Sequence, residues 1–159
     1  MKNKRLIFAW IAFIFWVGLI FYMSNQSGDI SSKQSGLVIK FFEMVGMDLN
    51  DQLGELATFL VRKAAHFTEY FILYFLTVNL IQHYFDIKKS ILYGFVFCFL
   101  YACTDEIHQY FIPGRAMAFK DVLIDSSGAL LGMIIRWLYT LKILRLKNID
   151  KYNNICWFN

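Results

Sequence analysis

Residues 6–23 read LIFAWIAFIFWVGLIFYM, an uninterrupted apolar run that follows Lys2, Lys4 and Arg5. A transmembrane helix needs about 20 mostly apolar residues, and this run approaches that length without a charged side chain. No A-x-A cleavage site follows, because the chain continues SNQSG, so we expect a retained anchor instead of a removed signal peptide. The run therefore predicts the first of several membrane spans.

Three further apolar runs predict three more spans. They are residues 64–82 (AAHFTEYFILYFLTVNLIQ), 90–104 (SILYGFVFCFLYACT) and 122–141 (VLIDSSGALLGMIIRWLYTL). The run 90–104 is short and crosses the bilayer only if Asp105 lies at the interface. We expect an all-α, multi-pass transmembrane helical bundle of about four spans. Residues 1–141 would form one membrane domain, and residues 142–159 a cytoplasmic tail.

The composition agrees with a protein whose solvent is the bilayer. Hydrophobic residues make up 58% of the 159 residues and charged residues 18%, against roughly 45–50% and 25% in soluble domains. This excludes a disordered chain, a collagen-like fibre and an ordinary cytosolic enzyme. The cysteines form no CxxC pair, so we expect neither a disulfide framework nor a zinc site. No basic block with interleaved aromatic residues points to nucleic acid as a partner.

The distribution of lysine and arginine predicts the orientation. Basic residues gather in three segments that a four-span chain places on one side: Lys2, Lys4, Arg5, Lys88, Lys89, Lys142, Arg145, Lys147 and Lys151. That side, with both termini, is expected to be cytoplasmic. Residues 24–61 carry five acids and two lysines, a net charge of −3. This segment and residues 105–121 are then expected to face outward.

The outer segment 24–61 also has helical periodicity. Apolar residues recur at helical spacing in two stretches, separated by Gly46 and Asn50–Asp51: Leu37, Phe41, Phe42 and Val45, then Leu53, Leu56, Phe59 and Leu60. We expect two short amphipathic helices that lie at the outer interface and pack on the bundle. In the fourth span, Gly128-xxx-Gly132 permits close approach of another helix.

Ionisable residues occur where an apolar chain should avoid them. Each charged side chain inside hydrocarbon costs at least ~2.5–3.5 kcal/mol on insertion scales. The predicted topology brings such residues to the outward ends of three spans. On the second span, one helix face carries Arg62, His66 and Glu69. Just past the third span, one face carries Asp105, His108 and Gln109, and Glu106 points elsewhere. The fourth span begins with Asp121 and Asp125, which lie one turn apart, and Ser126 follows Asp125.

Each of these residues alone also has a structural interpretation. A single histidine in a helix is more often packed than catalytic. Glu69 can pair with Arg62, and Asp125 can pair with Lys120. The lysines at positions 63, 88, 89 and 120 are explained most simply as charges that lie at the membrane interface and set the topology. Taken together, the set is harder to explain by stability, because buried ion pairs stabilise poorly compared with apolar residues. The set therefore predicts a functional site.

The loop TDEIHQYFIPGRAMAFKD, residues 104–121, holds the only proline of the chain. Pro113-Gly114 predicts a sharp turn that presents Arg115. A guanidinium group offers paired donors that match two phosphate oxygens, and Arg62 supplies a second such group. An oxyanion, above all a phosphate, is the ligand that this arrangement suits.

At these residues the chain resembles the VanZ-like family of bacterial membrane proteins. The resemblance runs from the first span to about Gly132 and rests on FYMSNQSGDISSKQS, RKAAHFTEYFILYF and YACTDEIHQYFIPGRAMAFKDVLIDSSGALLG. It implies a multi-pass protein of the bacterial cytoplasmic membrane. The founding member is associated with teicoplanin resistance, and the family is placed near proposed lipid-headgroup enzymes. This chain departs from the family at Met117 and Ala118, which bears on substrate fit, and at Asp125, often Asn in the family, which bears on that residue's role.

The first functional hypothesis is an enzyme that hydrolyses or exchanges a phosphoester in a lipid headgroup at the outer face. The lipid is a polyprenyl-phosphate precursor or a phospholipid. His66 or His108 would act as nucleophile or general base and the other as acid, with Glu69 and Asp105 orienting them. The catalytic set is His66, Glu69, Asp105, His108 and Asp121, and the substrate-binding set is Arg62, Gln109, Arg115 and Asp125.

No cofactor is fixed by the residues. Glu106, Asp121 and Asp125 form an oxygen-rich set that would hold a divalent cation, and such a set suits magnesium, calcium or manganese better than zinc. The absence of an H-E-x-x-H signature argues against a zinc protease.

Two alternatives stay open. A binding or shielding protein would hold a lipid-linked precursor without turnover and lower antibiotic access. Paired acidic and basic groups favour chemistry over a phosphate clamp made of arginines alone. An ion-coupled transporter ranks last, because four spans without visible repeats and with ionisable groups at one face are unusual for transporters.

The predicted orientation can be tested with single cysteines at positions 113 and 88 in a version without native cysteines. An impermeant thiol reagent applied to intact cells is expected to label position 113 and not position 88. Labelling after lysis serves as the control that both sites react. Labelling of intact cells at 88 alone would invert the topology.

Overall fold

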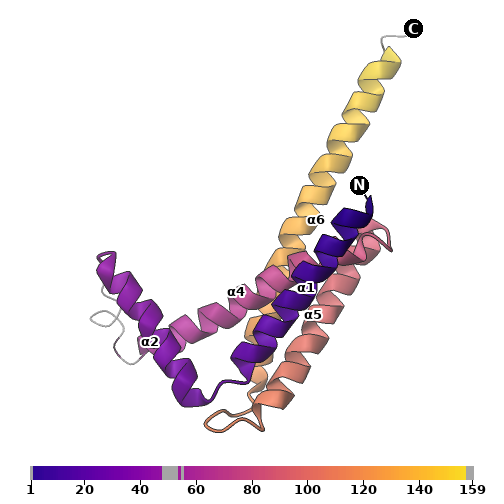
Figure 1. Ribbon diagram of the computed structural model, residues 1–159. Helices are drawn as coiled ribbons and strands as arrows, with labels where there is room; N and C mark the ends of the chain where they lie inside the picture. Colours follow the sequence, from indigo (N-terminus) through magenta and orange to yellow (C-terminus); the bar gives the residue numbers. More distant parts are fainter. Residues whose placement is uncertain (1, 48–53, 55, 157–159) are drawn as a thin grey trace.

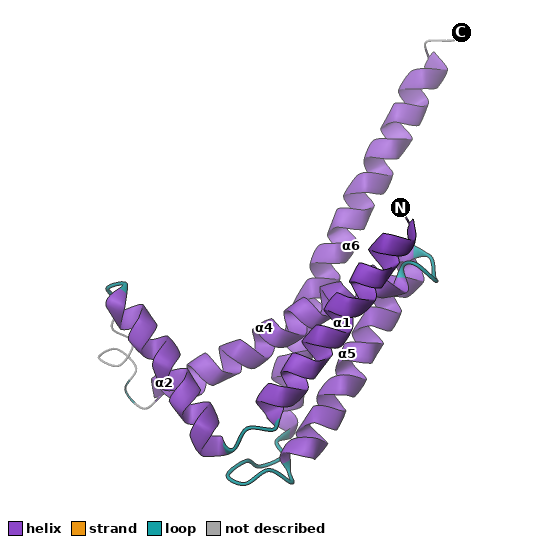
Figure 2. Cartoon of the chain, viewed as in Figure 1, coloured by secondary structure: helices purple, strands orange, loops and turns teal. Residues whose placement is uncertain are grey.

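A computed structural model describes the backbone of residues 2–47, 54 and 56–156, and the side chains of residues 3–47, 54 and 56–146. In this part of the chain every regular element is a helix (Figures 1 and 2). The helices are α1 (Lys2–Ser24), α2 (Gly28–Met44), α4 (Leu56–Ile81), α5 (Ile87–Gln109) and α6 (Phe119–Cys156). The predicted all-α class is confirmed.

In the described part of the chain, four helices are long and apolar enough to cross a membrane. They cover Asn3–Ser24, Leu56–Ile81, Ile87–Gln109 and Phe119–Leu146. The short third run lies inside α5, whose 23 residues make a helix about 34 Å long. The predicted number of four spans is confirmed, and each helix extends past its apolar run into polar sequence.

The connections between the helices gather at two ends. In Figure 1 the start of α1, the α4–α5 turn and the later part of α6 lie toward one end of the molecule. The α1–α2 and α5–α6 connections, residues 25–27 and 110–118, lie at the opposite end, which we call the loop end. The three basic segments therefore share one end, as the topology requires. The side of a membrane that this end faces stays a prediction.

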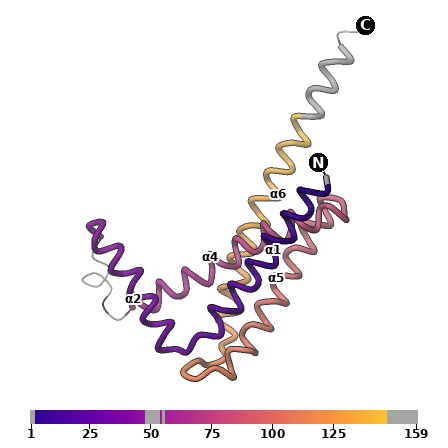
Figure 3. Tube along the Cα trace, in the orientation of Figure 1, coloured from indigo at the N-terminus to yellow at the C-terminus, as the bar shows by residue number. Residues whose placement is uncertain are grey.

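Helix α4 is the central element. It packs against α1, α2, α5 and α6, and the chain trace in Figure 3 shows α2 lying against the first part of α4, apart from the other helices. One face of α4 is fully buried at Tyr70, Leu73, Tyr74 and Val78, at helical spacing. The Tyr74 hydroxyl donates to the Ile91 carbonyl at 3.3 Å, which satisfies the polar end of this ring.

Two glycines of α6 let it approach α4 closely. A Cβ atom on Gly128 would lie 2.1 Å from the Phe67 carbonyl oxygen, and one on Gly132 would lie 2.7 Å from the Tyr74 ring. Only glycine therefore fits at this crossing, and the role predicted for Gly128-xxx-Gly132 is confirmed.

The outer segment differs from its prediction. Its first helix, α2, begins at Gly28, well before Leu37, and Leu37 and Phe41 are exposed as an interfacial face requires. The second predicted amphipathic helix is not separate, because Leu56, Phe59 and Leu60 form the first turns of α4. No glycine or proline lies between Leu56 and the apolar run that follows, so the helix continues into the span. The predicted features at 48–53 and 55 lie outside the described residues.

Replacement of Gly128 by alanine is expected to lower stability by about 1–3 kcal/mol, because the added methyl group pushes α6 away from the α4 backbone. Thermal unfolding in detergent, followed by tryptophan fluorescence, measures this as a lower Tm. Gly18→Ala is the matched control, because nothing lies within 4 Å of a Cβ at that position. Equal Tm values for the two variants would contradict close packing at Gly128.

Candidate functional site

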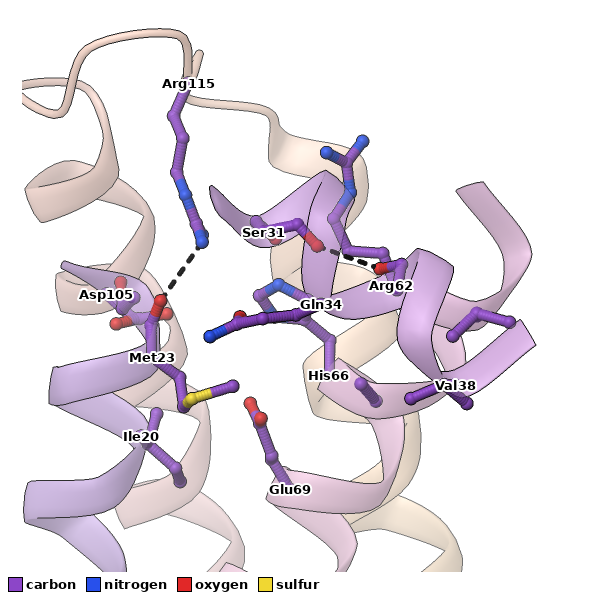
Figure 4. A pocket seen from close by; sticks show the side chains of 14 residues that line it. Ile20, Met23, Ser31, Gln34, Val38, Arg62, His66, Glu69, Asp105 and Arg115 are labelled. Atoms are coloured by element: carbon purple, nitrogen blue, oxygen red, sulfur yellow. Dashed lines mark hydrogen bonds between the residues drawn. The ribbon is translucent and has the colours of Figure 1, made fainter. Parts of the chain in front are cut away.

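Two adjoining cavities lie at the loop end. The first, of about 110 Å³, takes residues from α1, α2, α4 and α5 together with Arg115; we call it the carboxylate cavity, after Glu69 and Asp105. Figure 4 shows its side chains, with Arg115 reaching down from the α5–α6 connection. The second, of about 260 Å³, is the loop cavity and is lined by Arg62, His66, Gln109, Gly114, Arg115, Ala116 and Asp121. Three residues, Arg62, His66 and Arg115, line both cavities.

Helix α4 supplies one polar face to these cavities. Arg62, His66 and Glu69 all line the carboxylate cavity, as their spacing of four and three residues predicts. The Nδ1 atom of His66 lies 3.3 Å from Oδ1 of Asp125 on α6. Among the described residues, the Glu69 carboxylate makes no hydrogen bond or ion pair, and in Figure 4 it points into the cavity.

Helix α5 supplies an acid that is held by its own neighbour. Asp105 is buried, and its Oδ2 accepts a hydrogen bond of 3.0 Å from Nε2 of Gln109, one turn later. Gln109 was predicted to bind substrate. In the structure its amide group also fixes the Asp105 carboxylate, and Gln109 lines the loop cavity.

A candidate set of metal ligands differs from the predicted one. Within the described residues, His66, Asp105 and Asp125 each offer one ligand atom, and these atoms lie within 4.8 Å of one another. Of the predicted ligands Glu106, Asp121 and Asp125, only Asp125 belongs to this group. Glu106 accepts a 2.9 Å hydrogen bond from the Ala118 backbone N–H, and Asp121 forms an ion pair with Lys63.

These two contacts explain why the predicted set does not assemble. Glu106 is fully buried and fastens the loop just before α6. Lys63, interpreted from sequence as an interface charge, instead joins α4 to the start of α6 through Asp121. Both acids therefore hold a helix or a loop in place, and their spacing in the sequence does not indicate this role.

Arg115 has a structural function as well as a place in the cavities. Its Nε donates to the Gln26 carbonyl at 2.8 Å and its Nη2 to the Met23 carbonyl at 3.1 Å. A cation at these carbonyls suits the C-terminal end of α1, where the helix dipole is negative. Burial lowers the pKa of the Arg115 guanidinium, the charge of Asp105 raises this pKa, and the positive charge of Arg62 lowers it.

The predicted turn before Arg115 is present. Gly114 has a φ of 73°, in the left-handed region that favours glycine. The Gly28 backbone N–H donates to the Pro113 carbonyl at 3.2 Å, and a Cβ on Gly28 would lie 2.2 Å from the Gly114 oxygen. The turn therefore docks on the first residue of α2 and places Arg115 between the two connections.

His108 does not join the site that was predicted for it. It follows Asp105 by one turn, but it lines neither cavity, and its ring packs against that of Phe21 of α1, with centroids 4.8 Å apart and the ring planes tilted by 37°. The predicted pair of cooperating histidines is therefore not assembled at the cavities.

Four polar lining residues of the carboxylate cavity were not anticipated. They lie at the end of α1 and along α2: Ser24, Ser31, Gln34 and Ser35. Ser31 and Ser35 are both buried, and the Ser35 hydroxyl donates to the Ser31 carbonyl at 3.1 Å. A signal existed in SSKQS, because these small polar residues recur at helical spacing opposite the apolar Leu37 and Phe41.

Comparison with known proteins gives one match. A family model described as VanZ/LLP1 matches residues 8–142, a range that begins in α1, ends in α6 and includes both cavities. No curated protein and no solved structure matches the chain.

The two arginines are expected to differ in their effect on stability. Arg115→Gln removes the charged hydrogen bonds to the end of α1 and is expected to cost about 1.5–3 kcal/mol. Arg62→Gln is the matched control, because the Arg62 guanidinium group makes no hydrogen bond or ion pair with the described residues. Thermal unfolding in detergent is the measurement. A fall in Tm for Arg62→Gln as large as that for Arg115→Gln would show that the α1 contacts do not stabilise the fold.

Proposed function

The chain belongs to the VanZ/LLP1 family, and from that premise we propose that it is a membrane-embedded enzyme acting on the phosphate-linked headgroup of a lipid. The site would work at the outer face of the bacterial cytoplasmic membrane. The observation that carries the proposal is the position of Arg62 and Arg115 at two joined cavities that also contain Glu69 and His66. This combines anion-binding groups with groups that can transfer a proton.

Anion binding rests on the two guanidinium groups. Arg62 has no partner among the described side chains, and Arg115 uses its Nε and Nη2 for α1, which leaves Nη1 free. Two like charges near each other repel unless an anion lies between them, and guanidinium groups match phosphate oxygens well. A phosphate at the shared part of the cavities would therefore satisfy both arginines.

The proposed reaction is hydrolysis or exchange at a phosphoester. The oxygen of water or of an alcohol forms a new bond to phosphorus, and the ester P–O bond to the leaving alcohol breaks. Glu69 accepts the proton of the attacking oxygen, because its carboxylate points into the cavity without a hydrogen bond. Water in the loop cavity returns a proton to the leaving oxygen. Arg62 and Arg115 offset the charge on the phosphoryl oxygens.

A membrane lipid is favoured over a soluble phosphoester by an apolar groove. The groove has a volume of about 370 Å³ and is lined by Trp16, Val38, Phe42, Val61, Ala64, Ala65, Thr68, Glu69 and Ile72. It shares Val38, Val61, Ala65 and Glu69 with the carboxylate cavity. A hydrocarbon chain in this groove would leave its headgroup at Glu69, beside the arginines. Phospholipids and polyprenyl phosphates both meet this description.

The second candidate function is capture of a lipid-linked cell-wall precursor without turnover, which would fit a family linked to teicoplanin resistance. The observation that favours it is the position of His108, which lines neither cavity. Without a second histidine, the site keeps its phosphate clamp but loses one of the expected proton donors.

Purified protein in lipid nanodiscs, incubated with phospholipids and polyprenyl phosphates and analysed by mass spectrometry, tests the proposal. Wild type is expected to convert at least one lipid. Glu69→Gln is expected to lower turnover by ~10²–10⁴-fold, as removal of a general base does, while lipid still binds. Arg62→Gln is expected to weaken binding. Asp29→Asn, at an exposed position on α2, is the control and should match wild type.

Three outcomes separate the functions. Conversion that depends on Glu69 supports the enzyme. Binding that depends on Arg62, without conversion by wild type, contradicts the enzyme and supports precursor capture. Neither binding nor conversion would contradict both functions.

A further inference from the structure

We propose that His66, Asp105 and Asp125 bind one divalent transition-metal ion. The three side chains come from α4, α5 and α6, so only the folded bundle assembles the set. The inference goes beyond the proposed function, because an ion at these residues does not require turnover. It stands on the geometry, the burial and the charge of this cluster.

The geometry suits a metal ion after a small adjustment. One ligand atom from each residue lies within 4.8 Å of the other two. Ligand atoms on one ion lie at most about 4.2 Å apart, twice the usual metal–ligand distance. Neighbouring ligands of a tetrahedral or octahedral ion lie closer still, about 3–3.5 Å apart, so the three side chains would rotate toward one another to close the set around an ion.

The burial of Asp125 points to a missing positive partner. Its side chain is fully buried, with 0% exposure, and neither carboxylate oxygen has a hydrogen bond in the described structure. Its one close polar neighbour is His66, at 3.3 Å. A buried carboxylate without donors costs several kcal/mol, and coordination to a metal ion is one of the few arrangements that offsets this cost.

A neighbouring polar atom is also unsatisfied. The Tyr70 hydroxyl is buried without a hydrogen-bond partner among the described residues. Water molecules on a bound ion would supply a partner for such a group.

The cationic side chains nearby are already engaged or lie at the edge of the cavities. Lys63 pairs with Asp121, and Arg115 donates to the Met23 and Gln26 carbonyls. Arg62 and Arg115 line the carboxylate cavity with Glu69 and Asp105, but among the described residues no lysine or arginine forms an ion pair with Asp125, whose charged neighbour is His66. A divalent ion supplies the charge that this arrangement lacks.

The ligand set indicates which ions fit. One imidazole and two carboxylates suit manganese or zinc, whereas magnesium and calcium prefer oxygen ligands alone. The Gln109 amide that donates to Asp105 at 3.0 Å would orient this ligand, as outer partners of metal ligands do. Three protein ligands leave coordination positions open for water or for a phosphate oxygen.

Metal binding by the full-length protein tests the site directly. Protein stripped with a chelator is titrated with MnCl₂ and with ZnCl₂, and binding is followed by calorimetry, by the loss of the free Mn²⁺ signal in electron paramagnetic resonance and by elemental analysis. Wild type is expected to bind one equivalent of one or both ions. Asp125→Asn and His66→Gln are expected to weaken binding by more than the ~10–100-fold typical of an outer partner.

Two further variants make the test specific. Asp29→Asn is the control, because Asp29 is exposed on α2 and lines neither cavity; its affinity should equal that of wild type. Asp125→Cys keeps three ligands and should shift preference from manganese toward zinc, because thiolate is a softer ligand. Absence of saturable binding by wild type, or equal losses in Asp29→Asn and Asp125→Asn, would overturn the metal site whether or not the protein turns over a lipid.

Discussion

The contact between Gly128 of α6 and the backbone of α4 at Phe67 determines where the ionisable side chains meet. Gly128 lies one turn after Asp125, and Phe67 directly follows His66. When α6 comes close enough to touch the Phe67 carbonyl, Asp125 is brought to 3.3 Å from His66. The absence of one side chain therefore fixes the distance between two residues that carry the candidate chemistry.

The second constraint is the low polarity of the surroundings. A chain that buries acids in membrane-spanning helices must give each a partner. Asp121 has Lys63, Glu106 has the Ala118 N–H, and Asp105 has Gln109. Asp125 has only the imidazole of His66. The contacts of Asp121 and Glu106 hold the loop and the helices in place, whereas Glu69 at the carboxylate cavity makes no hydrogen bond or ion pair with its carboxylate among the described residues.

Much of the fold could be predicted because hydrocarbon imposes simple rules. The lengths of the apolar runs predicted the four spans. The basic residues predicted that three segments lie at one end of the bundle, which agrees with the structure. The spacing of Arg62, His66 and Glu69 predicted one face of α4. Beyond the apolar run of a helix, the sequence does not determine which neighbouring helix each side chain faces. His108 was therefore assigned to the site, although it packs on Phe21. The pairing of Lys63 with Asp121 depends on the tilt of α6 against α4, which no local spacing reveals.

The tie between the two outer connections limits how the cavities can be reached. The Pro113 carbonyl accepts from Gly28, and Arg115 holds the Met23 and Gln26 carbonyls, so the α1–α2 and α5–α6 connections are fastened to each other. The cavities can open toward the aqueous side only if both connections move together. At the groove between α1, α2 and α4, one hydrogen bond of 2.9 Å joins α1 to α4, from the Trp16 indole N–H to the Glu69 carbonyl, and most of the other lining side chains are apolar. A molecule that travels within the bilayer would therefore enter more easily from this side, which faces the hydrocarbon.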